Sequence, residues 1–303
     1  ASILARLIDQ DRDGGPAQTA IIQPVNEAGD TKAIMQREAV EAVDALYDTH
    51  FDKDTRRRMD RRETFAGVEL SHQDRLGILA HMGNVEGRQR VAATPGLTAE
   101  ARAAVMASFT AADVAWVQGL WALYEGYFQQ AVAMHERISG QTPKAVQRVP
   151  FTLEVGGERV ELDGGYMPIA YKASATMRQR TRDLVADVTK GQSAGALIDM
   201  WFLHERQAEV KGGRLRLDQG VIVNHLLSVT HMLAMREAVL DVQGVLANTT
   251  LRETLDKHYG PESRQWLDKW LKAVAADSGA PRNATENVLA ALRQRTVTAM
   301  LGF

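Results

Sequence analysis

The sequence predicts a mainly α protein, a multi-helix globular bundle with two long central helices and a small β-hairpin insertion near residues 149–171. Three observations support this prediction. Aromatic residues make up only 6% of the chain and Pro only 8 of 303 residues, whereas the helix formers Ala, Leu, Gln and Arg recur throughout. Apolar residues return at spacings of three and four over long stretches, the period of an amphipathic helix. With 45% hydrophobic residues, the chain is long enough to bury one large core or two smaller ones.

The N-terminal half is expected to be an arm followed by helices. Residues 1–30 contain Gly, Pro and polar runs that are typical of an arm or linker. Residues 31–148 form the predicted N-terminal helical part, where Ser71 is a typical N-cap because its hydroxyl can accept a free backbone N–H. The predicted helices of this part begin near Thr31, Lys53, Ser71, Asn84, Thr98 and Thr110.

The clearest helical pattern runs from Thr110 to about Ser139. No Pro interrupts it, and its apolar residues repeat at three and four. At 1.5 Å per residue this helix would be about 45 Å long, and Gly140 is placed to end it as a C-terminal cap. It is the first of the two long helices; the second follows Asp218 and covers about 30 residues, 219–248.

A β-hairpin insertion is predicted at residues 149–172. Two alternating runs flank Gly156 and Gly157, and glycine supplies the positive φ that a tight hairpin turn requires. A second reversal is expected before an extended run in which Pro168 favours an edge or irregular position. The tyrosines of this run are expected to anchor packing, with stacking on a base or sugar as the alternative. The structural residues of this segment are Gly164, Gly165, Tyr166, Pro168 and Tyr171.

Residues 173–303 form the predicted C-terminal helical part, which we expect to pack as one body with residues 31–148. Besides the second long helix, the pattern predicts a short strand near Arg214 and further shorter helices. These helices are expected at residues 174–189, 251–259, 262–276 and 284–300.

Several classes of site have no signature in the sequence. The absence of Cys removes disulfides and thiolate chemistry, and no apolar run of membrane-spanning length occurs. His225 and His231 are six residues apart, not the four that would let both bind one metal ion from a helix face, so we expect no metal site and no cofactor. The abrupt start and end suggest a piece of a longer chain, in which an enzyme domain could lie elsewhere.

A basic segment is the first candidate site. The net charge of −2 argues against a globally basic nucleic-acid binder but leaves room for a local patch. If residues 53–62 form a helix, their arginines recur one turn apart and make a cationic face that could follow phosphates. The other interpretation is a solvated helix paired with neighbouring acids. The arginines concerned are Arg56, Arg57, Arg58, Arg61 and Arg62.

Glu262 is a weak candidate for a catalytic residue. The pair Glu262-Ser263 after Gly260-Pro261 is similar to the Glu-Ser of soluble lytic transglycosylases, in which one carboxylic acid protonates a glycosidic oxygen. The same residues also suit the first turn of a helix, with Pro at the first position and an acid near the positive end of the dipole. We expect the second interpretation to hold.

Stretches spread over residues 75 to 303 together resemble a helical module of large tailed-phage proteins, namely the internal virion or ejected proteins and the long polyvalent proteins. The resembling stretches are Gly83–Arg90, Asp113–Trp121, Gly140–Pro143, Gly164–Tyr171, His204–Arg206, Leu217–Asp218, Val229–His231, Arg236–Ala238 and Thr298–Phe303.

The resemblance implies a protein that is packaged inside the virion and delivered into the host cell with the genome. It implies other virion or ejection proteins as partners, and it is compatible with DNA as a further partner and with a homo-oligomer. We therefore expect a non-catalytic structural or scaffolding module. A nucleic-acid-binding module and a peptidoglycan-cleaving, transglycosylase-like domain are the alternatives.

Overall fold

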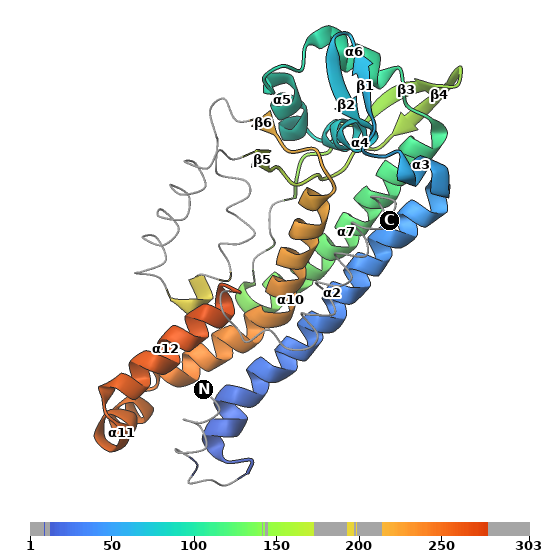
Figure 1. The fold of residues 1–303 in the computed structure, drawn as a ribbon. Coiled ribbons are helices and arrows are strands. Elements are labelled where there is room, and N and C mark those ends of the chain that lie inside the picture. Colours follow the sequence, from blue (N-terminus) through green and yellow to red (C-terminus); the bar gives the residue numbers. More distant parts are fainter. Residues whose placement is uncertain are drawn as a thin grey trace. The chain divides into compact units, whose positions relative to one another are not determined.

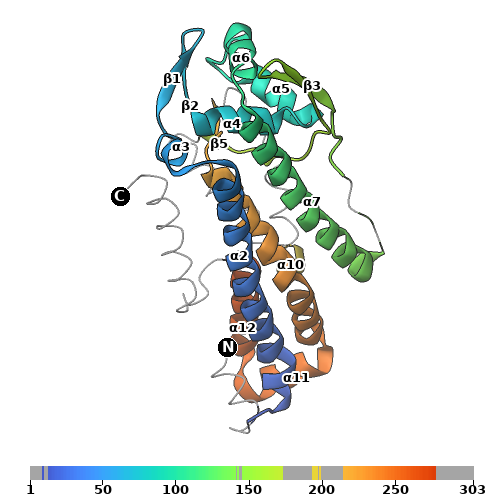
Figure 2. The same cartoon turned by 90° about the vertical axis from the view of Figure 1, so that its right-hand side faces the viewer.

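The computed structural model describes residues 9, 13–140, 142, 145–172, 193–196, 198 and 214–277. These residues form a mainly α fold, as predicted, with small antiparallel two-stranded sheets (Figure 1, Figure 2). The chain divides into two compact units. Unit 1 comprises Ala1–Arg37, Gln179–His204 and Leu227–Leu289, and unit 2 comprises Glu38–Arg178, Glu205–Leu226 and Ala290–Phe303. Two of the boundaries fall inside helices, α2 (Gln23–His50) and α10 (Gly220–Ala247).

Unit 1 has an entirely helical framework in the part that the structure describes. It contains the π-helix η1 (Gln18–Ile22), the first part of α2, most of α10, α11 (Thr249–Tyr259) and α12 (Pro261–Ala275). Gly260, with φ +78°, separates α11 from α12 where the sequence predicts a break. The buried side chains of its core include Ile21, Ile22, Val25, Ile198, Met235, Val239, Val242, Leu255, Leu267 and Leu271.

The beginning of α2 differs from the predicted arm. Helical structure extends back through η1, well before the expected start at Thr31. Asp9 explains part of the difference, because its carboxylate accepts the backbone N–H groups of Ala17 at 2.9 Å and Gln18 at 2.8 Å. The π-helical turn lies directly before Pro24, whose ring does not fit against the i−4 carbonyl of an ideal α-helix.

Unit 2 combines helices with three two-stranded sheets among its described residues. Its helices are the rest of α2, α3 (Lys53–Arg57), α4 (His72–His81), α5 (Val85–Ala93), α6 (Ala99–Met106), α7 (Ala111–Ser139) and the first turns of α10. Its strands are β1 (Arg62–Phe65), β2 (Val68–Ser71), β3 (Phe151–Val155), β4 (Glu158–Leu162), β5 (Tyr171–Lys172) and β6 (Arg214–Leu215).

Side-chain caps begin the helices of unit 2 where the sequence predicts them. Ser71, Asn84, Thr98 and Thr110 each accept a hydrogen bond from the backbone N–H three residues later. Two of these starts are full capping boxes, because an Asp at the third helical position also accepts the N–H of the cap residue. Gly140, at φ +65°, ends α7 in the left-handed conformation.

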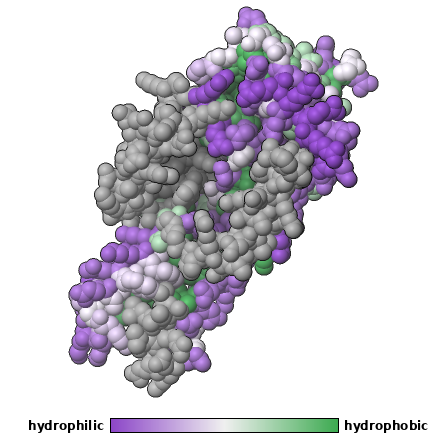
Figure 3. Space-filling model, viewed as in Figure 1, coloured by the Kyte–Doolittle hydropathy of each residue, from purple (hydrophilic) through white to green (hydrophobic). Residues whose placement is uncertain are grey.

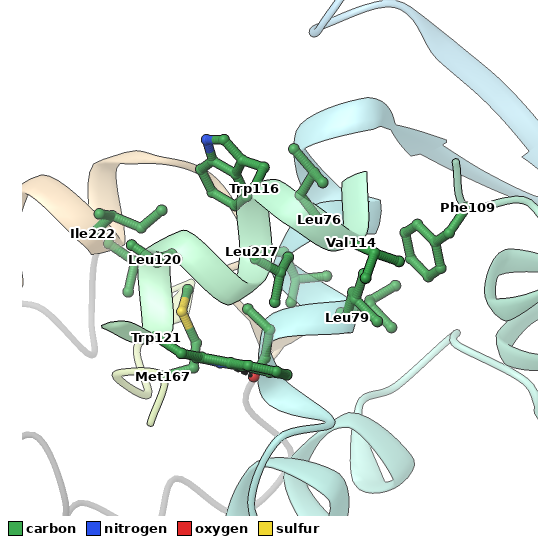
Figure 4. Close-up of a cluster of buried hydrophobic side chains, with 14 of the residues drawn as sticks. Leu76, Leu79, Phe109, Val114, Trp116, Leu120, Trp121, Met167, Leu217 and Ile222 are labelled. Atoms are coloured by element: carbon green, nitrogen blue, oxygen red, sulfur yellow. Dashed lines mark hydrogen bonds between the residues drawn. The ribbon is translucent and has the colours of Figure 1, made fainter. Parts of the chain in front are cut away.

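The core of unit 2 lies between α4, α7 and the segment that leads into α10 (Figure 4). Trp116 and Leu120 of α7 are 1% and 0% exposed, and Leu79 of α4 is 0% exposed. Gly77 lets the two segments approach closely, since a Cβ there would lie 2.5 Å from the carbonyl oxygen of Leu217. The backbone of α4 therefore lies close to the segment that precedes α10.

The predicted hairpin is confirmed and a second one appears that was not predicted. β3 and β4 pair from Phe151↔Leu162 to Val155↔Glu158, and Gly156 and Gly157 form the turn at φ +60° and +87°. β1 and β2 pair through a turn of Ala66 and Gly67, at φ +46° and +83°. A non-glycine residue with positive φ, such as Ala66, is uncommon. The Ala-Gly pair of this turn therefore lacks the Gly-Gly signal that predicts the β3–β4 turn.

Among the described residues three helices are long, since α2, α7 and α10 contain 28, 29 and 28 residues. In the part of the chain that the structure describes, no single helix is long and apolar enough to cross a membrane. α6 and α7 meet those criteria only together, as a pair bent by 99°. The predicted helices at residues 174–189 and 284–300 lie outside the described residues.

Candidate functional site

Residues of the resembling stretches meet where the end of α4 contacts the segments on either side of the β3–β4 hairpin. The carbonyl oxygen of Gly83 accepts the N–H of Val149 at 3.0 Å and that of Gly165 at 2.9 Å. The segment before β3 and the segment after β4 are thus both hydrogen-bonded to the Gly83 carbonyl. The residues of this site, which we call the glycine junction, are Gly83, Asn84, Arg88, Trp121, Gly164 and Gly165.

The glycines of the junction are required by close approach. A Cβ on Gly165 would lie 2.3 Å from Cγ of Trp121, and one on Gly83 would lie 2.5 Å from its Cζ2. Gly164 combines φ +75° with a position where a Cβ would be 2.4 Å from the oxygen of Gly83. The Trp121 indole therefore packs directly on backbone, and its Nε1 donates to the oxygen of Ala80 at 3.2 Å.

Two polar side chains complete the junction. Asn84 caps α5 by accepting the N–H of Gly87 at 2.7 Å, and its amide nitrogen donates to the oxygen of Gly165 at 3.0 Å. Arg88 donates from Nε to the oxygen of Met82 at 2.7 Å and from Nη2 to that of Val149 at 3.0 Å. Burial lowers the pKa of Arg88 from its ordinary value. Both side chains donate these hydrogen bonds to backbone carbonyls, as residues with a structural role do.

The other residues that the sequence predicts to be structural are Tyr166, Pro168 and Tyr171. Tyr166 packs its ring against those of Tyr124 and His225, with centroids 5.7 Å and 5.2 Å apart. Pro168 is buried in an irregular run, and Tyr171 begins β5, where it pairs with Leu215 of β6. Tyr166 is half-buried in this aromatic cluster, which agrees with the packing role that the sequence predicts.

The predicted basic helix at residues 53–62 is wrong beyond its first turn. α3 ends at Arg57, and the chain turns before β1 begins at Arg62. The segment has one apolar residue, Met59, which the turn buries to 1% exposure. A helix through this segment has no apolar stripe to bury, so burial of Met59 and pairing of β1 with β2 determine the conformation.

The arginines consequently do not share one helix face. Arg56 forms an ion pair with Asp48, and Arg57 lies 3.8 Å from Asp54. Arg57, Arg58 and Arg61 are exposed on a surface that Figure 3 shows as largely hydrophilic around α3. Arg62 belongs instead to β1, where it lines a separate pocket. The structure thus leaves a short exposed group of three arginines interleaved with acids.

Glu262 occupies the second position of α12, directly after Pro261. Its side chain is exposed, whereas glycosidases enclose their general acid in an apolar site. The neighbouring Ser263 is buried and donates its hydroxyl to the oxygen of Gly260 at 2.7 Å. The Glu-Ser pair therefore occupies the helix-start geometry that the sequence favours.

A partly buried His–Asp pair is a feature that sequence reasoning missed. His72 Nε2 lies 2.5 Å from Oδ1 of Asp113, whose Oδ2 accepts both the N–H and the hydroxyl of Thr110 at 2.8 Å. Burial acts to raise the pKa of Asp113, but the hydrogen bonds from His72 and Thr110 outweigh it and hold that pKa below its ordinary value. The pair joins the first turn of α4 to that of α7.

His81 is buried without a hydrogen-bond partner on either ring nitrogen in the described part of the chain. It lies in the last turn of α4 and is 0% exposed. Burial lowers its pKa to about 4, so the ring is neutral at physiological pH. Across the residues that the structure describes, no group of three or more His, Asp or Glu side chains is arranged to hold a metal ion.

Comparisons with protein-family models, with curated proteins and with solved structures found no match to this chain.

Proposed function

We propose that this chain is a non-catalytic structural module of a phage virion protein, packaged in the capsid and ejected into the host with the genome. The observation that supports this most is the convergence of separate resembling stretches in the glycine junction. Their polar and aromatic groups bind backbone and pack on glycine. Residues used in this way shape a fold and leave no reactive group for substrate.

Helical composition suits passage through a narrow channel. Local contacts re-form quickly after unfolding, and the absence of Cys means that no disulfide resists extension. Refolding after dilution from denaturant, followed by Trp fluorescence, should therefore recover the native signal without a slow dominant phase. Slow or incomplete recovery would remove this part of the argument.

Mass spectrometry of purified virions tests the proposal itself. Virions of the phage or induced prophage that encodes the chain should contain its peptides, and virions that have ejected their DNA in vitro should have lost them. An empty-capsid fraction without DNA serves as the control for adhering host protein. Absence of the peptides from intact virions would refute the proposal.

A nucleic-acid-binding module is the second candidate, favoured by the exposure of Arg57, Arg58 and Arg61. Binding of this kind weakens steeply with salt because phosphate contacts release counterions. DNA affinity is measured at two salt concentrations for the wild type and for a variant with the three arginines changed together to Gln. The comparison tests whether these arginines bind DNA. An affinity that is equal in the triple variant excludes these arginines from the contact.

A further inference from the structure

Arg62 of β1 and Arg214 of β6 lie far apart in the sequence but line one pocket of unit 2. The pocket lies between the β1–β2 hairpin, the turn at residues 94–97 and β6, elements that Figure 1 shows in the same part of unit 2. Among the described residues neither arginine forms an ion pair, unlike Arg56, Arg57, Arg75 and Arg216 in the same unit. Two exposed arginines without an ion-pair partner among the described residues therefore line a shared space.

The backbone that carries Arg214 is firmly held. Leu215 is 2% exposed, and the N–H of Arg216 donates to the oxygen of Ala170 at 2.7 Å. The Arg214 guanidinium passes over Gly96, where a Cβ would lie 3.9 Å from Nη2. On the other side, Arg62 is fixed by its pairing with Ser71 across the hairpin. Sheet pairing thus fixes the backbone of both arginines, while their side chains are exposed.

The size of the pocket limits what it can hold. Its volume is about 40 Å³, roughly three times the 10–15 Å³ that one water molecule needs. This space suits a compact group of a few heavy atoms. Guanidinium groups match the paired oxygens of phosphate in both charge and geometry.

Two acids, Asp74 and Glu69, also line the pocket, and their negative charges oppose those of the arginines. Asp74 has its Oδ2 engaged by the N–H and hydroxyl of Ser71, at 3.1 Å and 3.0 Å, and lies at the positive N-terminal end of α4. Glu69 is exposed on β2 and opposes an anion.

We propose that this pocket binds a phosphate group through Arg62 and Arg214, either a phosphodiester of a nucleic-acid backbone or a free phosphate ester. The site is separate from the exposed arginines of α3 and does not rest on the proposed virion role. Glu69 weakens the site, so its removal strengthens binding.

The test uses the full chain, a fluorescein-labelled single-stranded oligonucleotide followed by anisotropy at low salt, and inorganic phosphate followed by calorimetry. Arg62→Gln and Arg214→Gln should each weaken binding about tenfold and lower the salt slope by roughly 0.7. Glu69→Gln should tighten binding. Arg159→Gln is the matched control, because Arg159 is exposed on β4 outside the pocket and outside the Arg57–Arg61 group, and it should change affinity by less than about twofold.

The outcomes separate the sources of phosphate. Oligonucleotide binding that both pocket variants weaken supports the site and assigns it to a nucleic-acid backbone, whereas phosphate binding alone supports the site with a free phosphate ester. An equal loss in Arg159→Gln, or no binding of either probe, overturns the proposal. Thermal unfolding checks that each variant is folded; if Arg62→Gln is not, Arg214→Gln alone decides the question.

Discussion

Replacing Gly165 by Ala should destabilise unit 2 strongly, although the change adds only one methyl group. The new Cβ would lie 2.3 Å from Cγ and 2.6 Å from Cβ of Trp121, near the rigid start of that side chain. Overpacking of this kind costs about 1–3 kcal/mol. The backbone must move away, which also weakens the bonds from Gly165 N to Gly83 O and from Asn84 to Gly165 O, at about 1 kcal/mol each. The expected loss is about 3–5 kcal/mol.

The measurement is urea unfolding followed by Trp fluorescence and circular dichroism. Gly126→Ala is the matched control, because Gly126 is exposed on α7 with no atom within 4 Å of its would-be Cβ. That change should stabilise the helix by roughly 0.5–1 kcal/mol. Adding Trp121→Ala to Gly165→Ala should cost less than the sum of the two single changes, since the closest contact, with Cγ of Trp121, disappears. A Gly165→Ala variant as stable as the wild type would refute the close-approach argument.

Three further predictions concern buried polar groups. His81 has a folded pKa of about 4, below its unfolded value of about 6.5, so stability should fall as pH drops from about 6.5 towards 4. His231, whose pKa burial also lowers, contributes to the same slope, so His81→Leu should reduce that dependence in urea titrations, and an unchanged slope would contradict the assignment. Asp113 has a lowered pKa, so its contribution is present above the unfolded pKa of about 3.9 and is lost as pH falls through the folded value. Asp113→Asn should therefore cost about 1–3 kcal/mol at pH 7 and flatten the acid limb of the unfolding curve. Asn84→Ala should lower the unfolding free energy by about 1–3 kcal/mol, because it removes a cap and leaves the Gly165 oxygen without its donor; thermal unfolding no lower than in wild type would argue against both contacts.

Local chemistry made part of the fold predictable. Ser71 and Thr110 begin helices because one hydroxyl satisfies one free N–H, which needs no knowledge of the rest of the chain. Gly156 and Gly157 likewise specify the turn of β3–β4 by their own conformational freedom. These signals are short in range and visible in a single sequence.

Contacts between distant segments account for what the sequence did not reveal. Residues 53–62 satisfy a helical spacing of arginines, yet burial of Met59 and the β1–β2 pairing give a turn and a strand. The start of α2 was missed because its cap, Asp9, is separated from the helix by a Gly-Gly-Pro run. The convergence of Arg62 with Arg214 depends on tertiary structure alone, and no periodicity predicts it.

The bond between His72 and Asp113 ties the beginnings of two helices to a single carboxylate. Asp113 closes the capping box of α7 with one oxygen and holds the first residue of α4 with the other. Fraying of the first turn of α4 would disturb the first turn of α7, and the reverse. Amide protons in the first turns of these two helices should therefore exchange with solvent at matched rates. Loosening at either start is thereby shared between two segments that are remote along the polypeptide.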